Sequence, residues 1–326
     1  MTVLVTGATG FVGGAVVRRL AVDGVTVRAA VRSAWADVPA GVEQAMVGDL
    51  GSATDWSAAL TGVYGIVHCA ARVHVMRESA SDPLAEFRRV NVDGTVALAR
   101  AAAAAGVRRF VFISSIKVSG ERTEKGRAFV ADDPPAPVDP YGVSKLEAEQ
   151  ALLAIARDTG LEVAIIRPVL VYGPGVKGNF RSMMHWLRRG IPLPFGAVRN
   201  ERSFVALDNL VDLAVVCLRH PAAPGQVFLV SDGEDLSTPA LLRLTAAALG
   251  RPARLLPIPV ALLRVAASAV GRPGVADRLC GSLRVDIEKT RRLLGWTPPV
   301  SVATALARAA APVRTEAGVI AAREGA

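Results

Sequence analysis

Residues 5–14 read VTGATGFVGG and carry three glycines in the spacing GxxGxxG. This stretch lies between a short apolar run at 2–7 and a run with helical periodicity at 11–24. Glycines at a strand-to-helix turn let the backbone approach a pyrophosphate, which the free N–H groups of the helix N-terminus then hold. The stretch therefore predicts a dinucleotide-binding turn. The contacts that we expect in it are Gly7, Thr9, Gly10, Phe11, Val12 and Gly13.

The rest of the chain continues this alternation of strand and helix. After TVLVTG at 2–7, the further β-prone runs are VTVRAAVR, YGIVHCAA, VRRFVFISSI and LEVAIIRPVLVYG, with helical stretches between them. Such alternation predicts an α/β fold with a Rossmann-type, doubly wound parallel sheet. Pro and Gly become denser after Gly173. We expect a dinucleotide-binding domain at 1–173, a smaller, mostly helical substrate-binding region at 174–312 that returns in places to the sheet, and a tail at 313–326.

Composition limits the class of protein. The 326 residues are 51% hydrophobic, which allows a large core, and the three cysteines form no CxxC pair, which favours a reducing, cytoplasmic location. The apolar stretch at 257–271 is interrupted by Arg264 and is too short to span a bilayer, so we expect no integral membrane segment. The formal charge of +9 is not concentrated in a basic block. We therefore expect no nucleic-acid partner.

A tyrosine and a lysine stand four residues apart in DPYGVSKLEAE at 139–149. On a helix that begins near Pro140, Tyr141 and Lys145 project from the same face. The spacing alone allows two interpretations. The pair is either a surface aromatic beside a solvated lysine, or a phenol whose pKa is lowered from about 10 by a neighbouring ammonium and a positively charged nicotinamide.

Two serines precede this helix, at the end of the strand in VFISSIKVSG. Ser114 and Ser115 should lie at the carboxyl edge of the sheet, where doubly wound folds bind their ligands. The loop between Ser115 and Tyr141 is long enough to fold back over that edge. A serine that faces a substrate oxygen beside a Tyr–Lys pair indicates a site for chemistry at a hydroxyl group.

With the glycine turn, the serine and the Tyr-x-x-x-Lys motif in this order, the chain resembles the extended short-chain dehydrogenase/reductase superfamily, in its nucleotide-sugar epimerase/dehydratase/reductase branch. The resemblance extends to DIEKTRRLLGWTP at 286–298. It implies that Ser115, Tyr141 and Lys145 are catalytic. Further cofactor contacts that it implies are Asp49, Leu50, Ala70, Ala71 and Pro168, with Asn91 steadying the strand that carries the active-site loop.

The resemblance also implies a site for the nucleoside diphosphate of the substrate. Asn179 in KGNF, Arg202 in ERSFVALDNL and Arg278 are its expected contacts, because a guanidinium can bind a pyrophosphate through two hydrogen bonds. The alternatives are a turn asparagine at 179 and surface ion pairs at the two arginines. A homodimer is implied through the helices at 83–105 and 141–158, which could instead pack only within the chain.

The end of the second strand bears on the choice of dinucleotide. NAD-binding chains usually carry an acid there for the ribose hydroxyls, whereas Val31 and Arg32 occupy these places. Because a guanidinium suits a 2′-phosphate, we expect NADP(H) to be preferred, with NAD(H) possible. The alternative is a solvated arginine at a strand end.

Departures from the family patterns reduce the number of reactions that the chain is expected to catalyse. The Asp–Glu pair of 4,6-dehydratases is replaced by Ile116 and Lys117, and the tyrosine typical of 4-epimerases by Ser119. SSIKVSGE, LPFGAVRNERSFVALDNLVDL and DGEDLSTPALL look most like reductases that act on UDP-4-keto-6-deoxy-N-acetylhexosamines for surface-polysaccharide synthesis. A UDP-hexose 4-epimerase is the alternative, and a non-catalytic dinucleotide sensor is a third possibility. Lys117 either contacts the substrate or is solvated.

Overall fold

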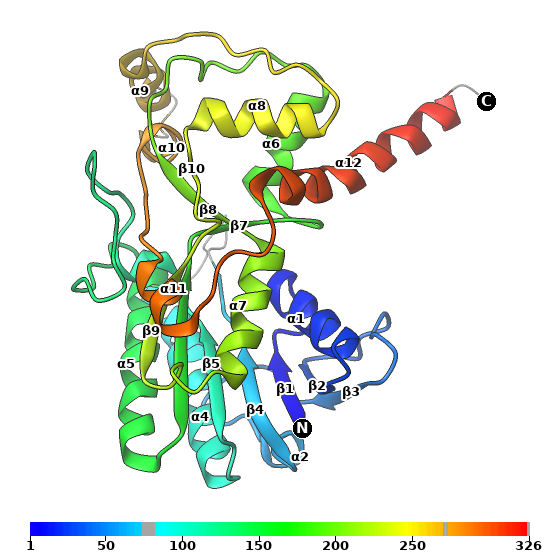
Figure 1. Cartoon of the computed structure of the whole chain (residues 1–326), viewed down its shortest axis with the longest axis vertical. Helices are drawn as coiled ribbons and strands as arrows, with labels where there is room; N and C mark the ends of the chain where they lie inside the picture. Colours follow the sequence, from blue (N-terminus) through cyan, green and yellow to red (C-terminus); the bar gives the residue numbers. More distant parts are fainter. Residues whose placement is uncertain (74–81, 270, 272, 325–326) are drawn as a thin grey trace.

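A computed structural model describes residues 1–326 except 74–81, 270, 272 and 325–326. Its centre is a seven-stranded, wholly parallel sheet in the order β3-β2-β1-β4-β5-β6-β9 (Figure 1). The strands are β1 (Thr2–Thr6), β2 (Thr26–Val31), β3 (Val42–Met46), β4 (Val63–His68), β5 (Arg109–Ile113), β6 (Glu162–Pro168) and β9 (Gln226–Val230). This confirms the predicted Rossmann-type fold.

Helices cover both faces of the large sheet, which explains why its central strands are nearly continuous apolar runs. On one face, α1 (Phe11–Val22) packs against α7 (Leu207–Arg219). On the other, α4 (Gly94–Ala104) packs against α5 (Pro140–Thr159), with the short α2 (Ser57–Leu60) and α3 (Pro83–Arg88) nearby. Neighbouring residues of β1 enter opposite cores, Val3 and Val5 the first and Leu4 the second. The order in which strands are added to the sheet reverses between β1 and β4, and this point of a doubly wound sheet is where ligands bind.

The later part of the chain forms a smaller, mostly helical region above the sheet (Figure 1). It contains a three-stranded sheet in the order β10-β8-β7 and a third core. Its strands are β7 (Leu170–Tyr172), β8 (Arg202–Ala206) and β10 (Asp235–Leu236). Its helices are α6 (Gly178–Arg188), α8 (Thr238–Ala248), α9 (Val260–Ala269), α10 (Pro273–Cys280) and α12 (Val302–Glu324). Between these elements, α7, β9 and α11 (Glu288–Leu294) return to the large sheet, where α11 packs against β9.

Three local features differ from the simplest expectation. The apolar run at 161–173 is not one strand, because β6 ends at Pro168 and β7 belongs to the second sheet. The helix expected at 83–105 contains a π-helical turn, η1 (Arg89–Asp93). The helix α12 continues through residue 313, where the sequence predicts that a tail begins, and Val313 is buried in the third core. Within the described residues, we find no helix long and apolar enough to cross a bilayer.

Candidate active site

The glycine turn between β1 and α1 forms a cradle with almost no free space on its inner side. Gly7 has φ +63°, and a Cβ added there would lie 2.8 Å from the Ala70 nitrogen. A Cβ on Gly13 would lie 2.2 Å from the Gly7 carbonyl oxygen. Only glycine therefore permits this approach of β1, α1 and the segment that follows β4. The first turn of α1 begins at Gly10, whose position carries no side-chain cap.

This geometry fits a nicotinamide dinucleotide. The uncapped N–H groups at the start of a twelve-residue helix are suited to a pyrophosphate, and the glycines keep side chains away from them. Thr9 is exposed beside this turn, while Phe11 and Val12 are half-buried in the first turn of α1. Ala70 and Ala71 are half-buried at the end of β4, and Pro168 is buried at the end of β6. The structure thus places these predicted cofactor contacts at the ends of β1, β4 and β6.

Arg32, at the end of β2, and Asp49 make a weak contact at the surface. Their side chains are 78% and 82% exposed, and the Arg32 Nη1 lies 3.5 Å from the Asp49 carboxylate. A weak contact between two exposed groups leaves both free to reorient towards a ligand. Leu50 is different, because it packs against the second core. Arg32 is therefore available to a ribose or its phosphate, without the structure selecting between them.

Asn91 links two parts of the site through the π-helical turn η1. Its side-chain oxygen accepts a hydrogen bond from the Arg72 backbone N–H at 2.8 Å, and its amide nitrogen donates to the Arg72 carbonyl at 3.0 Å. The same nitrogen donates to Ser144 of α5 at 3.0 Å. Single π-helical turns often occur at functional sites. The steadying role expected of Asn91 thus takes the form of a bridge between the segment after β4 and the tyrosine helix.

Ser115 and Tyr141 are brought into contact, as the sequence predicts. Ser115 begins a single 3₁₀ turn, η2 (Ile116–Val118), directly after β5, and its hydroxyl lies close enough to the Tyr141 phenol to lower the pKa of that phenol. Tyr141 lies in the first turn of α5, which is capped by Asp139 and opened by Pro140. The Tyr141 ring also packs edge-on against Phe87, with ring centroids 6.0 Å apart.

Lys145 lies one turn further along α5 and is only 1% exposed. Its ammonium nitrogen is 4.0 Å from the centroid of the Phe112 ring. Burial lowers the pKa of Lys145 to about 7, although the charges of Glu149 and Cys69 act in the opposite direction. An ammonium in this place is thus easily deprotonated.

The pKa expected for Tyr141 needs a correction. In the protein without a dinucleotide, burial raises the pKa of Tyr141 to about 12, the hydrogen bond from Ser115 lowers it, and the charge of Asp139 raises it further. Lys145 does not offset this burial. The lowered pKa that the sequence suggested therefore needs an additional positive charge, and a bound oxidised nicotinamide would supply one.

The expected contacts to the nucleoside diphosphate fall into two places. Arg202 at the start of β8 donates from Nη1 to the Arg278 carbonyl at 2.9 Å and to the Gly281 carbonyl at 3.0 Å. Burial lowers the pKa of Arg202. Asn179 is exposed in the first turn of α6, on a separate element.

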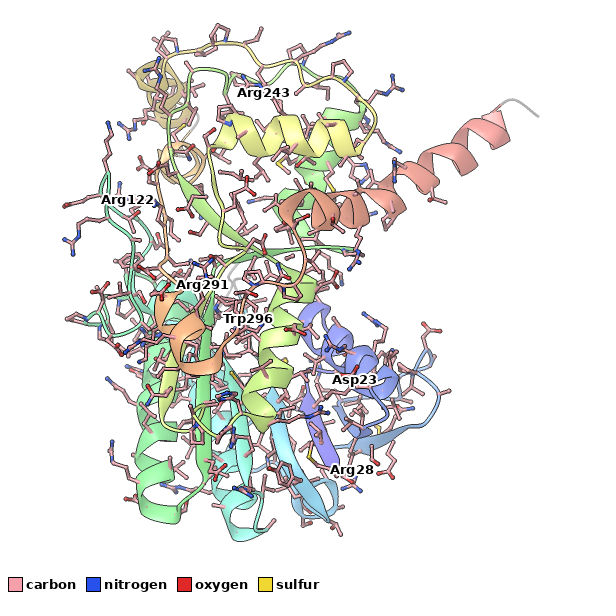
Figure 2. All side chains as sticks on the ribbon, viewed as in Figure 1. Asp23, Arg28, Arg122, Arg243, Arg291 and Trp296 are labelled. Carbon is pink, nitrogen blue, oxygen red and sulfur yellow. The ribbon has the colours of Figure 1, made fainter. Side chains whose placement is uncertain are left out.

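A cavity of about 210 Å³ adjoins Arg278. It lies between α10 and the loop that follows η2, and Figure 2 shows Arg122 on that loop. The residues that line it are Glu121, Arg122, Asp277 and Arg278.

Some important residues were not found from the sequence. Glu149 on α5 and Arg167 on β6 form a buried ion pair, with Nη2 of Arg167 2.6 Å from the carboxylate. Ser114 also donates to this carboxylate, and Arg167 donates to Ser119 at 3.2 Å. The spacing of Glu149, four residues after Lys145 on the same helix, was the available signal. Within the described residues, no group of acids, histidines and cysteines could hold a metal ion.

A profile of the NAD dependent epimerase/dehydratase family matches residues 3–231, which include the glycine turn, Ser115, Tyr141 and Lys145. The chain belongs to this family. A UDP-glucose 4-epimerase of Vibrio cholerae is 48% identical over 300 residues, covering 91% of each chain. The family is NAD-dependent and this relative is named for a reaction of a nucleotide sugar, which confirms the resemblance drawn from the motifs.

Solved structures support the same fold. MoeE5, in complex with UDP-glucuronic acid and NAD, is 28% identical with a TM-score of 0.76, covering 97% of this chain and 100% of that one. The UDP-N-acetylglucosamine 4-epimerase of Bacillus cereus is 23% identical with a TM-score of 0.79, covering 96% and 99%. At that identity, the second likeness bears on the fold alone.

Proposed function

We propose that this enzyme catalyses oxidation or reduction at C4 of a UDP-sugar, with Tyr141 as the residue that transfers the proton. The observation that carries the proposal is the proximity of the Ser115 hydroxyl to the Tyr141 phenol at the carboxyl edge of the sheet, with Lys145 one turn away. This edge also carries the glycine cradle. The proton-transferring groups and the dinucleotide site therefore open towards the same side of the sheet.

The residues have separate tasks in this proposal. A nicotinamide dinucleotide, when bound, supplies or accepts the hydride at C4. Tyr141 donates its phenolic proton to the C4 oxygen during reduction and accepts that proton during oxidation. Ser115 donates a hydrogen bond to the same oxygen and stabilises its negative charge. Lys145 holds a positive charge near the phenol when protonated, while Arg202, Arg278 and Asn179 bind the nucleoside diphosphate.

For the net reaction, we favour reversible 4-epimerisation of a UDP-hexose or UDP-N-acetylhexosamine. This reverses the order expected from the sequence, because the Vibrio cholerae relative named a UDP-glucose 4-epimerase matches 91% of the chain. Epimerisation uses the groups named above twice. The hydride first leaves C4 while the proton leaves the C4 hydroxyl oxygen, and then a hydride returns to the opposite face of C4 and a proton to the same oxygen.

A second candidate is reduction of a UDP-4-keto-6-deoxy-N-acetylhexosamine with NADPH. It is favoured by the end of β2, where Val31 and Arg32 stand in place of an acid and the Arg32 guanidinium is exposed. In this case the dinucleotide exchanges at every turnover. For either reaction we propose a homodimer formed through α4 and α5, which lie side by side on one face of the sheet (Figure 1).

The test offers purified enzyme both kinds of substrate. UDP-glucose and UDP-N-acetylglucosamine, without added dinucleotide, should be converted to their C4 epimers, read from the anomeric proton signals. In parallel, UDP-4-keto-6-deoxy-N-acetylglucosamine and NADPH are followed at the absorbance band of reduced nicotinamide. Epimers alone support the first candidate, and stoichiometric NADPH oxidation supports the second. If neither occurs, the proposed function is wrong.

A further inference from the structure

The Lys117 side chain, which the sequence left as either a substrate contact or a solvated group, is 34% exposed and forms ion pairs within the chain. Its ammonium contacts two carboxylates, lying 3.0 Å from Glu121 and in a short contact with Asp139. Burial lowers the pKa of Lys117, but the hydrogen bonds and charges of Asp139 and Glu121 outweigh this effect and raise it. Lys117 is therefore a paired cation at the wall of the site, and its charge is directed at the start of the tyrosine helix.

The same residue is also attached to the catalytic serine. The backbone N–H of Lys117 donates to the Ser115 hydroxyl oxygen at 3.2 Å. Asp139, its side-chain partner, accepts a hydrogen bond from the Gly142 N–H at 2.7 Å and so caps the helix on which Tyr141 lies. The packing here is close, because a Cβ on Gly142 would lie 2.8 Å from the Lys117 carbonyl oxygen. Main chain and side chain of one residue thus contact the two elements that carry Ser115 and Tyr141.

We propose that Lys117 is a positioning residue that joins the serine turn to the tyrosine helix and neutralises Asp139 beside the Tyr141 phenol. This inference deepens the proposed function and rests on it for the kinetic part of its test. The Asp139 carboxylate is two residues from Tyr141 and has an unfavourable effect on the phenolate. An ammonium bound to that carboxylate reduces the repulsion.

The other groups around the Tyr141 phenol come from several elements, and none of those described below contacts the Asp139 carboxylate as a cation. Ser115 contributes a hydrogen bond, and Lys145 lies one turn along α5 but is itself easily deprotonated. The Phe87 ring contacts Tyr141 edge-on and also carries the Arg72 guanidinium, which lies 5.7 Å from the centroid of that ring. Asp139 is thus the acid that acts on Tyr141, and Lys117 is the cation in contact with it.

The test uses Lys117→Met, Asp139→Asn and the double variant, with Glu121→Gln as the matched control. Asparagine caps helices as well as aspartate does, so Asp139→Asn keeps the hydrogen bond to Gly142 while removing the charge. Lys117→Met leaves Asp139 without its cation. We expect the pKa of Tyr141 to rise by about one unit, so that turnover in the oxidation direction falls about tenfold. The double variant should recover most of that loss.

A second readout does not depend on activity. The chain has three tyrosines, so tyrosine labelled with ¹³C at Cζ gives three signals, and Tyr141→Phe assigns one of them. We expect Asp139→Asn to titrate Tyr141 at lower pH than wild type, the double variant to return towards wild type, and Glu121→Gln to leave the titration unchanged.

A double variant as slow as Lys117→Met, or the same Tyr141 titration in wild type, Asp139→Asn and the double variant, would overturn the role of Lys117. If wild type converts no UDP-sugar, the proposed function fails instead, and the titration still decides whether Lys117 and Asp139 are coupled to Tyr141.

Discussion

The buried ion pair beneath the active site allows a quantitative prediction. Arg167 and Glu149 have side chains only 5% and 3% exposed, and Nε of Arg167 lies 3.0 and 3.2 Å from the two carboxylate oxygens. They join α5 to β6 directly below Lys145. When a buried pair loses one partner, the remaining charge has neither water nor a counterion, and stability falls by about 3–5 kcal/mol.

We therefore expect Arg167→Met and Glu149→Gln each to lower the free energy of unfolding by about 3–5 kcal/mol, a large part of the ~5–15 kcal/mol typical of a folded domain. The double variant removes both charges and should lose clearly less than the sum of the two single effects. Glu149→Gln should also lower the pKa of Lys145 further, because the charge of Glu149 raises it.

The assay is urea unfolding followed by circular dichroism for both single variants and the double variant. Arg88 and Glu147 provide a matched control, since Glu147 is also on α5 and the pair is bidentate but 48% and 28% exposed. Arg88→Met should cost about 0–1 kcal/mol. Additive effects of the two buried variants, or a loss from Arg167→Met no larger than that from Arg88→Met, would refute the reasoning.

Three further results are expected. Burial holds the pKa of Lys145 near 7 in the folded protein, so the unfolded chain binds more protons than the folded one between pH 7 and about 10. As the pH rises through that range, the free energy of unfolding of wild type should therefore increase relative to that of Lys145→Met, by up to about 1.4 kcal/mol per pH unit. Urea unfolding of wild type and Lys145→Met at three pH values tests this prediction, and a substitution of the exposed Lys125, Lys125→Met, is the control. If the difference in free energy of unfolding between wild type and Lys145→Met is the same at all three pH values, the prediction is wrong. Gly13→Ala places a Cβ 2.2 Å from the Gly7 carbonyl and should lower stability by about 1–3 kcal/mol and abolish NADH binding, seen by fluorescence. Gly51→Ala is the stability control, because a Cβ added at Gly51 meets nothing within 4 Å. Normal NADH binding by Gly13→Ala would show that the glycine turn does not bind the dinucleotide. If Arg32 reads a 2′-phosphate, Arg32→Ala should lose about 1.5–3 kcal/mol of NADPH affinity and none for NADH in calorimetry, whereas equal losses would argue against that role.

The sequence predicted the large sheet because its strands are buried on both faces and therefore apolar throughout. The two edge strands were not found. In β3, Val42–Met46 is half polar and partly exposed, and β9 (Gln226–Val230) is a short run in the segment after Gly173, where the alternation of strand and helix is no longer regular. The end of β6 at Pro168 was not predicted, because the residues on both sides of Pro168 are apolar. The two segments differ only in the sheet that they join, and the sequence does not show this.

At the site, the contact between Ser115 and Tyr141 followed from motif order and sheet topology. The charged groups around these two residues could not be predicted in the same way. The pKa of Tyr141 depends on burial, which the spacing of Tyr141 and Lys145 does not report. The partners of Lys117 come from 4 and 22 residues away, and only the folded loop brings both to one ammonium.

The role of Tyr141 in C4 chemistry is the central claim, and one comparison tests it most directly. Wild type and Tyr141→Phe are given a UDP-hexose or its 4-keto derivative with the dinucleotide, and the change at C4 is followed by NMR. We expect Tyr141→Phe to remain folded, to bind the dinucleotide, and to turn over about 10²–10⁴-fold more slowly. Conversion at C4 by Tyr141→Phe at the rate of wild type would contradict the account.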